Sequence, residues 1–174
     1  KQPEGAKAEA VQAEIAGTHV LVVDDNALSR RGLILMLSAW QCRAEEAPNA
    51  ATALDKLHGA ARAGDPFSIA IIDMLMPEMD GETLGTFIKQ TPDLRNTQLV
   101  MVTSVGRRGD ATRLEELGFS AYLTKPIKRV HLKACLETLK GIAPSCDQEQ
   151  VGLVTRHSLT EDQKRRVRIL LAED

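Results

Sequence analysis

The stretch Ile69-Ala70-Ile71-Ile72-Asp73 decides the fold, because four apolar residues lead directly into a carboxylate. A short run this rich in isoleucine is typical of a strand that is buried on both faces of a parallel sheet. A carboxylate can end such a strand at the carboxyl edge of the sheet, which is where open α/β sheets bind their ligands. We therefore expect Asp73 to lie in a binding site at that edge.

Three further segments repeat the arrangement of an apolar strand followed by polar groups. Because the carboxyl ends of parallel strands meet at one edge of a sheet, these polar groups are expected to converge on Asp73. The groups are Asp24 and Asp25 after Val20–Val23, Thr103 after Leu99–Val102, and Lys125 after Tyr122-Leu123.

Strand and helix patterns alternate five times along the chain. This alternation predicts an α/β fold, a doubly wound five-stranded parallel sheet with helices on both faces. Helical spacing predicts that Val130 faces inward on the last helix and that Arg30 and Arg31 lie on the solvated side of the first. The expected strands are 19–23, 42–47, 69–73, 98–102 and 121–123, and the expected helices are 27–40, 50–63, 81–90, 110–117 and 127–140.

The composition excludes several classes of protein. The 174 residues are 43% hydrophobic with a net charge of −2, so a core can form and no nucleic-acid-binding surface is expected. Cys42, Cys135 and Cys146 are widely spaced, which favours reduced thiols in a cytoplasmic protein. No apolar stretch approaches the roughly 20 residues of a membrane span, and no signal peptide is visible. We expect this fragment to make no membrane contact.

The two ends of the chain differ in composition from its middle. Residues 1–17 are predicted to be a tail or linker, 18–141 the α/β domain and 142–167 a linker. Arg168-Ile-Leu-Leu-Ala-Glu-Asp174 repeats the pattern of His19–Asp25, which predicts that a second, truncated copy of the domain begins at 168. The alternative is a helix over 159–171, which the pair Ser158 and Glu161 could cap.

The three acids expected at the sheet edge would repel one another when all are ionised. A hard divalent cation relieves this repulsion, and Mg²⁺ prefers such oxygen ligands, whereas zinc would favour His or Cys. Lys125 and Thr103 would suit negative charge that develops on phosphoryl oxygens during transfer. Because Asp24 and Asp25 are adjacent and can share the metal, Asp73 is the best candidate for a nucleophile that forms an aspartyl-phosphate.

Four motifs in this order resemble the receiver domain of two-component response regulators, over roughly His19–Lys140. That family has a flavodoxin-like fold, with five parallel strands in the order 2-1-3-4-5 and five helices, in agreement with the pattern above. The motifs are His19-Val-Leu-Val-Val-Asp-Asp-Asn26, Ile71-Ile-Asp-Met-Leu-Met-Pro-Glu-Met-Asp-Gly81, Val102-Thr-Ser104 and Tyr122-Leu-Thr-Lys-Pro126.

The resemblance implies a role for each site residue. Asp73 would accept phosphate from the phosphohistidine of a histidine kinase or histidine phosphotransfer protein. Asp24, Asp25 and Asp73 would hold Mg²⁺ together with the backbone carbonyl of Leu75. Lys125 would pair with the phosphoryl group.

The resemblance also implies a switch and a phosphate lifetime. Thr103 would move to hydrogen-bond the phosphoryl group, Tyr122 would turn inward with it, and Pro126 would follow a cis peptide bond. Family members often carry polar side chains at the positions of Leu75 and Val105, where they can hold the attacking water. Because both residues are apolar here, we expect slow self-dephosphorylation.

The restart at Arg168 is similar to the tandem receivers of hybrid sensor histidine kinases, so the parent chain would be such a kinase. The domain itself would not be an enzyme acting on outside substrates. Two alternatives remain: a binding module that is never phosphorylated, and an aspartyl-phosphate hydrolase, which would need a second acid where Leu75 stands. The acids could also be ordinary helix caps. A homodimer through the fourth and fifth helices is left open.

Overall fold

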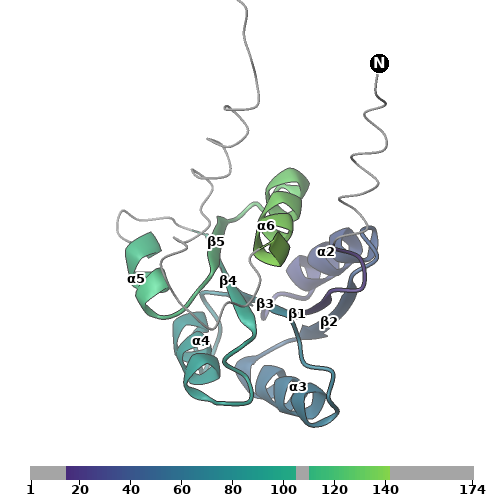
Figure 1. Cartoon of the computed structure of the whole chain (residues 1–174). Coiled ribbons are helices and arrows are strands. Elements are labelled where there is room, and N and C mark those ends of the chain that lie inside the picture. Colours follow the sequence, from purple (N-terminus) through teal and green to yellow (C-terminus); the bar gives the residue numbers. More distant parts are fainter. Residues whose placement is uncertain (1–14, 105–109, 142–174) are drawn as a thin grey trace, which may run out of the picture.

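Five parallel strands form one sheet in the order β2-β1-β3-β4-β5 in the computed structural model, which describes residues 15–104 and 110–141 (Figure 1). This is the predicted order, and five helices flank the sheet as predicted. The strands are β1 (His19–Val23), β2 (Arg43–Ala47), β3 (Ile69–Asp73), β4 (Gln98–Thr103) and β5 (Ala121–Thr124). The helices are α2 (Ala27–Ser38), α3 (Ala50–Arg62), α4 (Gly81–Gln90), α5 (Asp110–Glu116) and α6 (Arg129–Gly141).

The sheet separates two hydrophobic cores, because successive side chains of a strand point to opposite faces. Ile69 and Ile71 of β3 belong to the core under α2 and α6, whereas Ala70 and Ile72 belong to the core under α3, α4 and α5. Figure 1 shows the same two layers of helices. All five residues of β3 are buried, as expected for a strand covered on both faces.

The parallel register brings the carboxyl ends of the strands to one edge. Asp73 pairs with Val102, and Thr103, the next residue of β4, pairs with Thr124 of β5. The residues that follow β1, β3, β4 and β5 therefore meet at this edge.

Side chains other than the site acids cap the helices beside that edge. Asn26 is the N-cap of α2, and its side chain accepts hydrogen bonds from the backbone N–H groups of Leu28 and Ser29. Asp80 caps α4 in the same way through Thr83. The alternative that Asp24, Asp25 and Asp73 are N-caps is therefore wrong.

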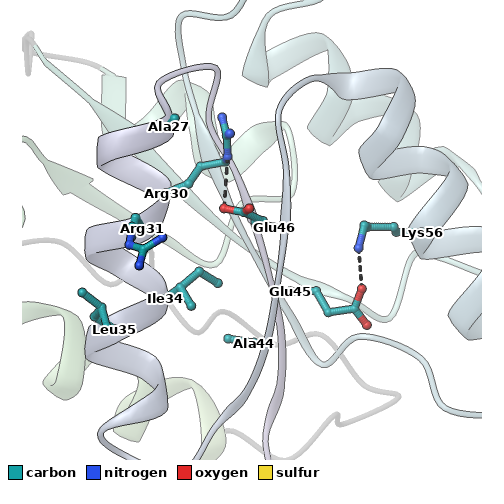
Figure 2. A pocket seen from close by; sticks show the side chains of 9 residues that line it. All are labelled: Ala27, Arg30, Arg31, Ile34, Leu35, Ala44, Glu45, Glu46 and Lys56. Atoms are coloured by element: carbon teal, nitrogen blue, oxygen red, sulfur yellow. Dashed lines mark hydrogen bonds and ion pairs between the residues drawn. The ribbon is translucent and has the colours of Figure 1, made fainter.

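The edge strand β2 is polar and is tied to a helix on each side. Glu46 pairs with Arg30 of α2 at 3.3 Å, and Glu45 pairs with Lys56 of α3 at 2.6 Å. Figure 2 shows these pairs around the groove between α2 and β2. Charged side chains on an edge strand hinder pairing with another chain.

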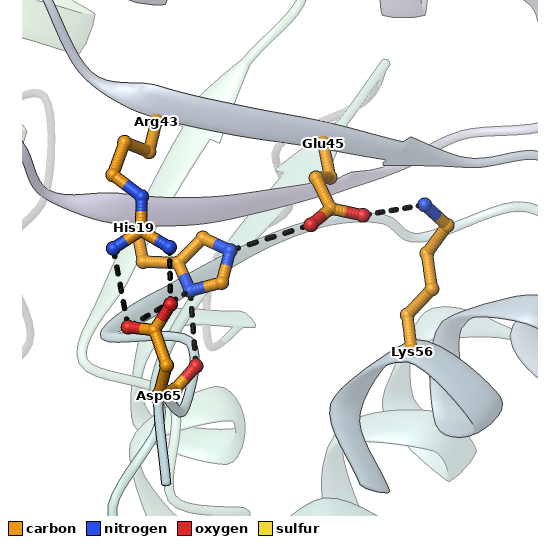
Figure 3. A network of polar contacts seen from close by, with 5 residues as sticks. All are labelled: His19, Arg43, Glu45, Lys56 and Asp65. Atoms are coloured by element: carbon orange, nitrogen blue, oxygen red, sulfur yellow. Dashed lines mark hydrogen bonds and ion pairs between the residues drawn. The ribbon is translucent and has the colours of Figure 1, made fainter. Parts of the chain in front are cut away.

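A polar network joins the opposite, amino-terminal end of the sheet (Figure 3). His19 is buried, its ring stacks on Phe67 with the centroids 3.9 Å apart, and its Nε2 lies 3.5 Å from Glu45. Its Nδ1 lies 3.2 Å from the backbone oxygen of Asp65, whose carboxylate also pairs with Arg43. The network joins β1, β2 and the loop before β3 far from the acidic edge.

Two expectations about side-chain direction are wrong. Val130 is 60% exposed, because it lies two residues before the buried Leu132 and so points to the other side of α6. Arg30, expected on a solvated face, has a side chain only 12% exposed. Gly118 lies two residues after the end of α5 and has a φ of +87°, the left-handed conformation typical of a residue that ends a helix.

Residues just before β1 contact the rest of the domain. Ile15 is fully buried against the core, and the N–H of Gly17 donates to the carbonyl of Gln41. The linker expected over 142–167, the restart at 168–174, and residues Val105 and Cys146 lie outside the described residues. Within the described residues, no helix combines the length and hydropathy that a membrane crossing requires.

Candidate functional site

Three carboxylates converge at the carboxyl edge of the sheet. Asp24 and Asp25 follow β1, and Asp73 is the last residue of β3. One oxygen from each lies within 4.8 Å of the others. Asp24 is 2% and Asp73 6% exposed, whereas Asp25 faces solvent. The sequence therefore predicted correctly that these acids are neighbours.

Lys125, just past β5, binds two of the three carboxylates. Its Nζ lies 2.9 Å from Asp24 Oδ2 and 3.0 Å from Asp73 Oδ2. Burial lowers the pKa of Lys125, but hydrogen bonds to the two carboxylates outweigh burial, so the pKa is raised overall. The ammonium is therefore charged and partly compensates the buried acids.

The surroundings of Asp73 destabilise the ionised form of its carboxyl group. Burial raises its pKa, the hydrogen bond from Lys125 opposes that rise, and the neighbouring charge of Asp24 adds to it. The net shift is upward, so ionised Asp73 is less stable here than in water. A further positive charge at this edge would relieve that cost.

The loop between β1 and α2 holds the acidic pair through local hydrogen bonds. The backbone N–H of Asn26 donates to Asp24 Oδ1 at 2.8 Å. The guanidinium of Arg30 donates to the backbone carbonyls of Asp24 at 2.8 Å and Asp25 at 3.2 Å. Arg30 was not identified from the sequence as a site residue, because its partners are backbone carbonyls, which every residue carries. The available signal was its place in the first turn of α2, where side chains lean toward the N-terminus of the helix.

The loop between β3 and α4 passes very close to Asp73 at the end of β3. The N–H of Gly81 donates to the carbonyl of Met74, and the N–H of Met74 donates to the carbonyl of Val102. A Cβ on Gly81 would lie 2.3 Å from the backbone oxygen of Asp73. Glycine is therefore required there. Leu75 lies in this loop, with its side chain 69% exposed.

Thr103 lies on β4, the strand next to that of Asp73, and Tyr122 lies on β5, one strand further away. Thr103 is buried at the end of β4, and its hydroxyl donates to Met74 Sδ at 3.4 Å. Its backbone carbonyl accepts the N–H of Lys125 at 2.8 Å. Tyr122 of β5 is partly buried against the core under α3 and α4. The Lys125–Pro126 peptide bond is cis, as expected.

The donor set at this edge fits a hard divalent cation. Three carboxylates carry more negative charge than Lys125 compensates. Burial is the main cause of the raised pKa of Asp73, and the charge of Asp24 adds to it. All the side-chain donors are oxygens, which Mg²⁺ prefers. No His or Cys belongs to this group among the described residues, so a softer metal is disfavoured.

Comparison with known proteins gives one consistent family. Residues 20–137 match the family described as response regulator receiver domain. The response regulator PleD of Caulobacter vibrioides is 37% identical over 120 residues, which cover 69% of this chain and 25% of PleD. Hybrid signal transduction histidine kinase L of Dictyostelium discoideum is 28% identical over 121 residues, 68% of this chain and 7% of that protein.

A solved structure agrees with these relatives. The signal receiver domain of a signal transduction histidine kinase from Syntrophus aciditrophicus superposes with a TM-score of 0.63 at 27% identity, covering 77% of this chain and 98% of that one. The chain thus spans about a quarter or less of the two curated relatives above and nearly all of an isolated receiver domain. The family match covers more than half of the chain, and the chain therefore belongs to the response regulator receiver family.

Proposed function

We propose that this domain accepts a phosphoryl group on Asp73 within a two-component phosphorelay. The observation that carries the proposal is the buried Asp73 carboxylate, 3.0 Å from the Lys125 ammonium and beside Asp24 and Asp25. A carboxylate placed at a sheet edge between a cation and further acids is suited to covalent phosphoryl transfer.

The transfer step uses the Asp73 carboxylate as the nucleophile. One of its oxygens forms a bond to phosphorus while the phosphorus–nitrogen bond of the donor phosphohistidine breaks. The bonding electron pair leaves with the imidazole nitrogen, and the product is an acyl phosphate on Asp73. Lys125 stays close enough to pair with the added negative charge.

Asp24, Asp25 and Asp73 would hold Mg²⁺, with the backbone carbonyl of Leu75 as a further ligand. The bound ion would neutralise negative charge on the carboxylates and on the phosphoryl oxygens. Asp24 already accepts hydrogen bonds from Asn26 and Lys125, which orient its two oxygens. The backbone carbonyl of Asp25 accepts a hydrogen bond from Arg30 at 3.2 Å, which helps to hold this residue in place.

Thr103 and Tyr122 are proposed to change conformation after phosphorylation. The hydroxyl of Thr103 would leave Met74 Sδ, a weak acceptor, for a phosphoryl oxygen, which is a stronger one. Tyr122, partly buried on the adjacent strand, would then move further inward. This coupled movement would carry the signal from Asp73 to the surface of β5.

The donor is proposed to be a protein phosphohistidine, from a histidine kinase or a histidine phosphotransfer protein. Exposed apolar side chains on the segments that follow β1, β3 and β5 support a protein partner. Leu28 is 83% exposed at the start of α2, Leu75 is exposed in the loop after β3, and Val130 is exposed at the start of α6. Apolar groups clustered around a site favour protein contact.

The relatives also suggest the wider context of the domain. One of them is named as a hybrid histidine kinase, and one superposed structure is the receiver domain of a histidine kinase. We propose that residues 18–141 are one receiver of such a kinase, that 142–167 link it to a second receiver beginning at 168, and that 1–17 tether it to the segment before. Residues 142–174 lie outside the described part of the chain.

Intact mass spectrometry after incubation with acetyl phosphate tests the central proposal. We expect one added phosphate on the unmodified chain with Mg²⁺, and none without Mg²⁺ or in Asp73→Asn. Asp55→Asn is the matched control, because Asp55 is an exposed acid on α3, and this variant should be phosphorylated normally.

The outcomes separate the two leading functions. Phosphorylation that survives Asp73→Asn would overturn the assignment of the acceptor. An unmodified chain that gains no phosphate from acetyl phosphate or from a phosphorylated histidine phosphotransfer protein would support a module that only binds partners.

A further inference from the structure

Arg30 makes more contacts with the acidic loop than its surface position on α2 requires. Its guanidinium donates to the backbone carbonyls of Asp24 at 2.8 Å and Asp25 at 3.2 Å. Two consecutive carbonyls of the β1–α2 loop are therefore bonded to this one side chain. The loop cannot shift without breaking these hydrogen bonds.

The guanidinium is itself held from the other side. Arg30 Nε donates to Glu46 Oε2 at 3.3 Å, across the groove between α2 and β2 (Figure 2). Glu46 lies on β2 opposite Val22 of β1, so the sheet holds the backbone from which this carboxylate extends. The planar guanidinium can bond several acceptors in fixed directions, which a lysine cannot reproduce.

We propose that Arg30 is a positioning residue, which holds the backbone of Asp24 and Asp25 so that their carboxylates converge with Asp73 on a divalent cation. The proposal rests on the proposed function, because it concerns the same cation site. Arg30 contacts neither the cation nor the phosphoryl group; it acts only through the loop that carries the two acids.

The change in Mg²⁺ affinity on replacing Arg30 distinguishes a positioning role from a purely electrostatic one, because the two predict changes of opposite sign. A positive charge near a cation site opposes cation binding, so removing the charge of Arg30 alone would strengthen binding of Mg²⁺. Loss of positioning has the opposite effect, because the freed loop must then be ordered when the cation binds. Removing groups that orient metal ligands typically weakens metal affinity by about 10- to 100-fold.

Titration calorimetry of the 174-residue chain with Mg²⁺ tests the proposal. We expect Arg30→Gln to raise the dissociation constant for Mg²⁺ by about 10-fold or more. Arg31→Gln removes the same charge from the neighbouring, exposed residue of α2 and should leave the constant unchanged or slightly lower it. Arg30→Lys keeps the charge and should still weaken binding, and it supplies the measurement if the glutamine variant does not fold.

The free energy of unfolding in urea, measured without Mg²⁺, shows how far each variant destabilises the fold. Weaker Mg²⁺ binding in Arg30→Gln and Arg30→Lys while both remain folded at 25 °C supports the positioning role. Unchanged or tighter binding in both Arg30 variants overturns it and leaves the proposed function intact. Absence of Mg²⁺ binding and of phosphorylation in the unmodified chain overturns the proposed function instead.

Discussion

The ammonium of Lys125 lies 3.0 Å from the carboxylate of Asp73, although their strands are not neighbours in the sheet. Strand β4 separates β3 from β5, so the lysine side chain extends across the end of β4 to reach the acid. The same ammonium also contacts Asp24, which follows β1 on the other side of β3. Lys125 therefore forms ion pairs with acids from two strands of the carboxyl edge. The acids of this edge are therefore stabilised by a side chain from a distant strand as well as by the backbone.

Asp73 should make the metal-free domain less stable as the pH rises. Burial raises its folded-state pKa above the ordinary value of about 3.9, so above that value the folded chain binds more protons than the unfolded chain. Stability from the protonated carboxyl is then lost as the pH rises through the folded-state pKa. Asp73→Asn removes this loss, and we expect it to stabilise the metal-free domain near pH 7.

Urea unfolding of both chains without metal, at several pH values, provides the measurement. The difference between the variant and the unmodified chain should shrink toward about pH 3, where the carboxyl is neutral in the folded and unfolded states. A difference that stays constant with pH would contradict the upward pKa shift of Asp73.

Lys125→Met should destabilise the metal-free domain by roughly 1–3 kcal/mol near pH 7, because it leaves two buried carboxylates without their shared cation. Lys133→Met is the matched control. The Lys133 side chain is 27% exposed, against 25% for Lys125, but its partner is Glu137 on the surface of α6. That pair should contribute less than about 0.5 kcal/mol.

A double-mutant cycle with Asp73→Asn measures the coupling directly. We expect Lys125→Met to cost less in the Asp73→Asn background, because one of the two uncompensated carboxylates is then absent. Equal costs in both backgrounds would mean that Lys125 stabilises the fold through packing and not through Asp73.

Most of the fold could be predicted because parallel strands carry a local signal. The five strands were located to within one residue at their ends; four are apolar runs bounded by polar or turn residues, and β2 is a polar edge strand. Val130 was wrongly predicted to face inward because it was grouped with the buried leucines of α6, although it lies on another side of that helix. The starts of four helices were predicted correctly, whereas α6 begins at Arg129 rather than at 127.

The site could be predicted only in part, for a physical reason. Asp24, Asp25, Asp73 and Lys125 converge because the carboxyl ends of parallel strands coincide, which follows from topology. The contacts of Arg30 with backbone carbonyls leave no pattern in the sequence, since the acceptor groups occur at every residue.

Gly81 should be essential to the close approach of the β3–α4 loop to Asp73. A methyl group there would meet the backbone oxygen of Asp73, and backbone cannot rotate away as a flexible side chain can. We expect Gly81→Ala to lower the free energy of unfolding by roughly 1–3 kcal/mol, the usual cost of overpacking. Gly59→Ala is the control, because Gly59 lies inside α3 with open space around it.

Urea unfolding again distinguishes the two variants. Gly59→Ala should raise the free energy of unfolding by about 0.5–1 kcal/mol, because alanine favours a helix interior. If Gly81→Ala is as stable as the unmodified chain, the close approach of the β3–α4 loop to Asp73 is not a constraint.

Leu75 should lengthen the life of the phosphorylated state. Its exposed side chain offers no polar atom near Asp73, whereas an amide at this position could orient the water that attacks the acyl phosphate. We expect Leu75→Asn to shorten the phosphate lifetime by about 10-fold, the effect of roughly one hydrogen bond in the transition state. The fold should tolerate this change, because the side chain is exposed.

The decay of phosphorylated protein with time, followed by intact mass, provides the test. Leu35→Asn is the matched control, because Leu35 is also an exposed leucine but lies on the outer side of α2. That variant should keep the lifetime of the unmodified chain. A lifetime of seconds in the unmodified chain would contradict the expectation, since the attacking water would then be well oriented without a polar side chain at position 75.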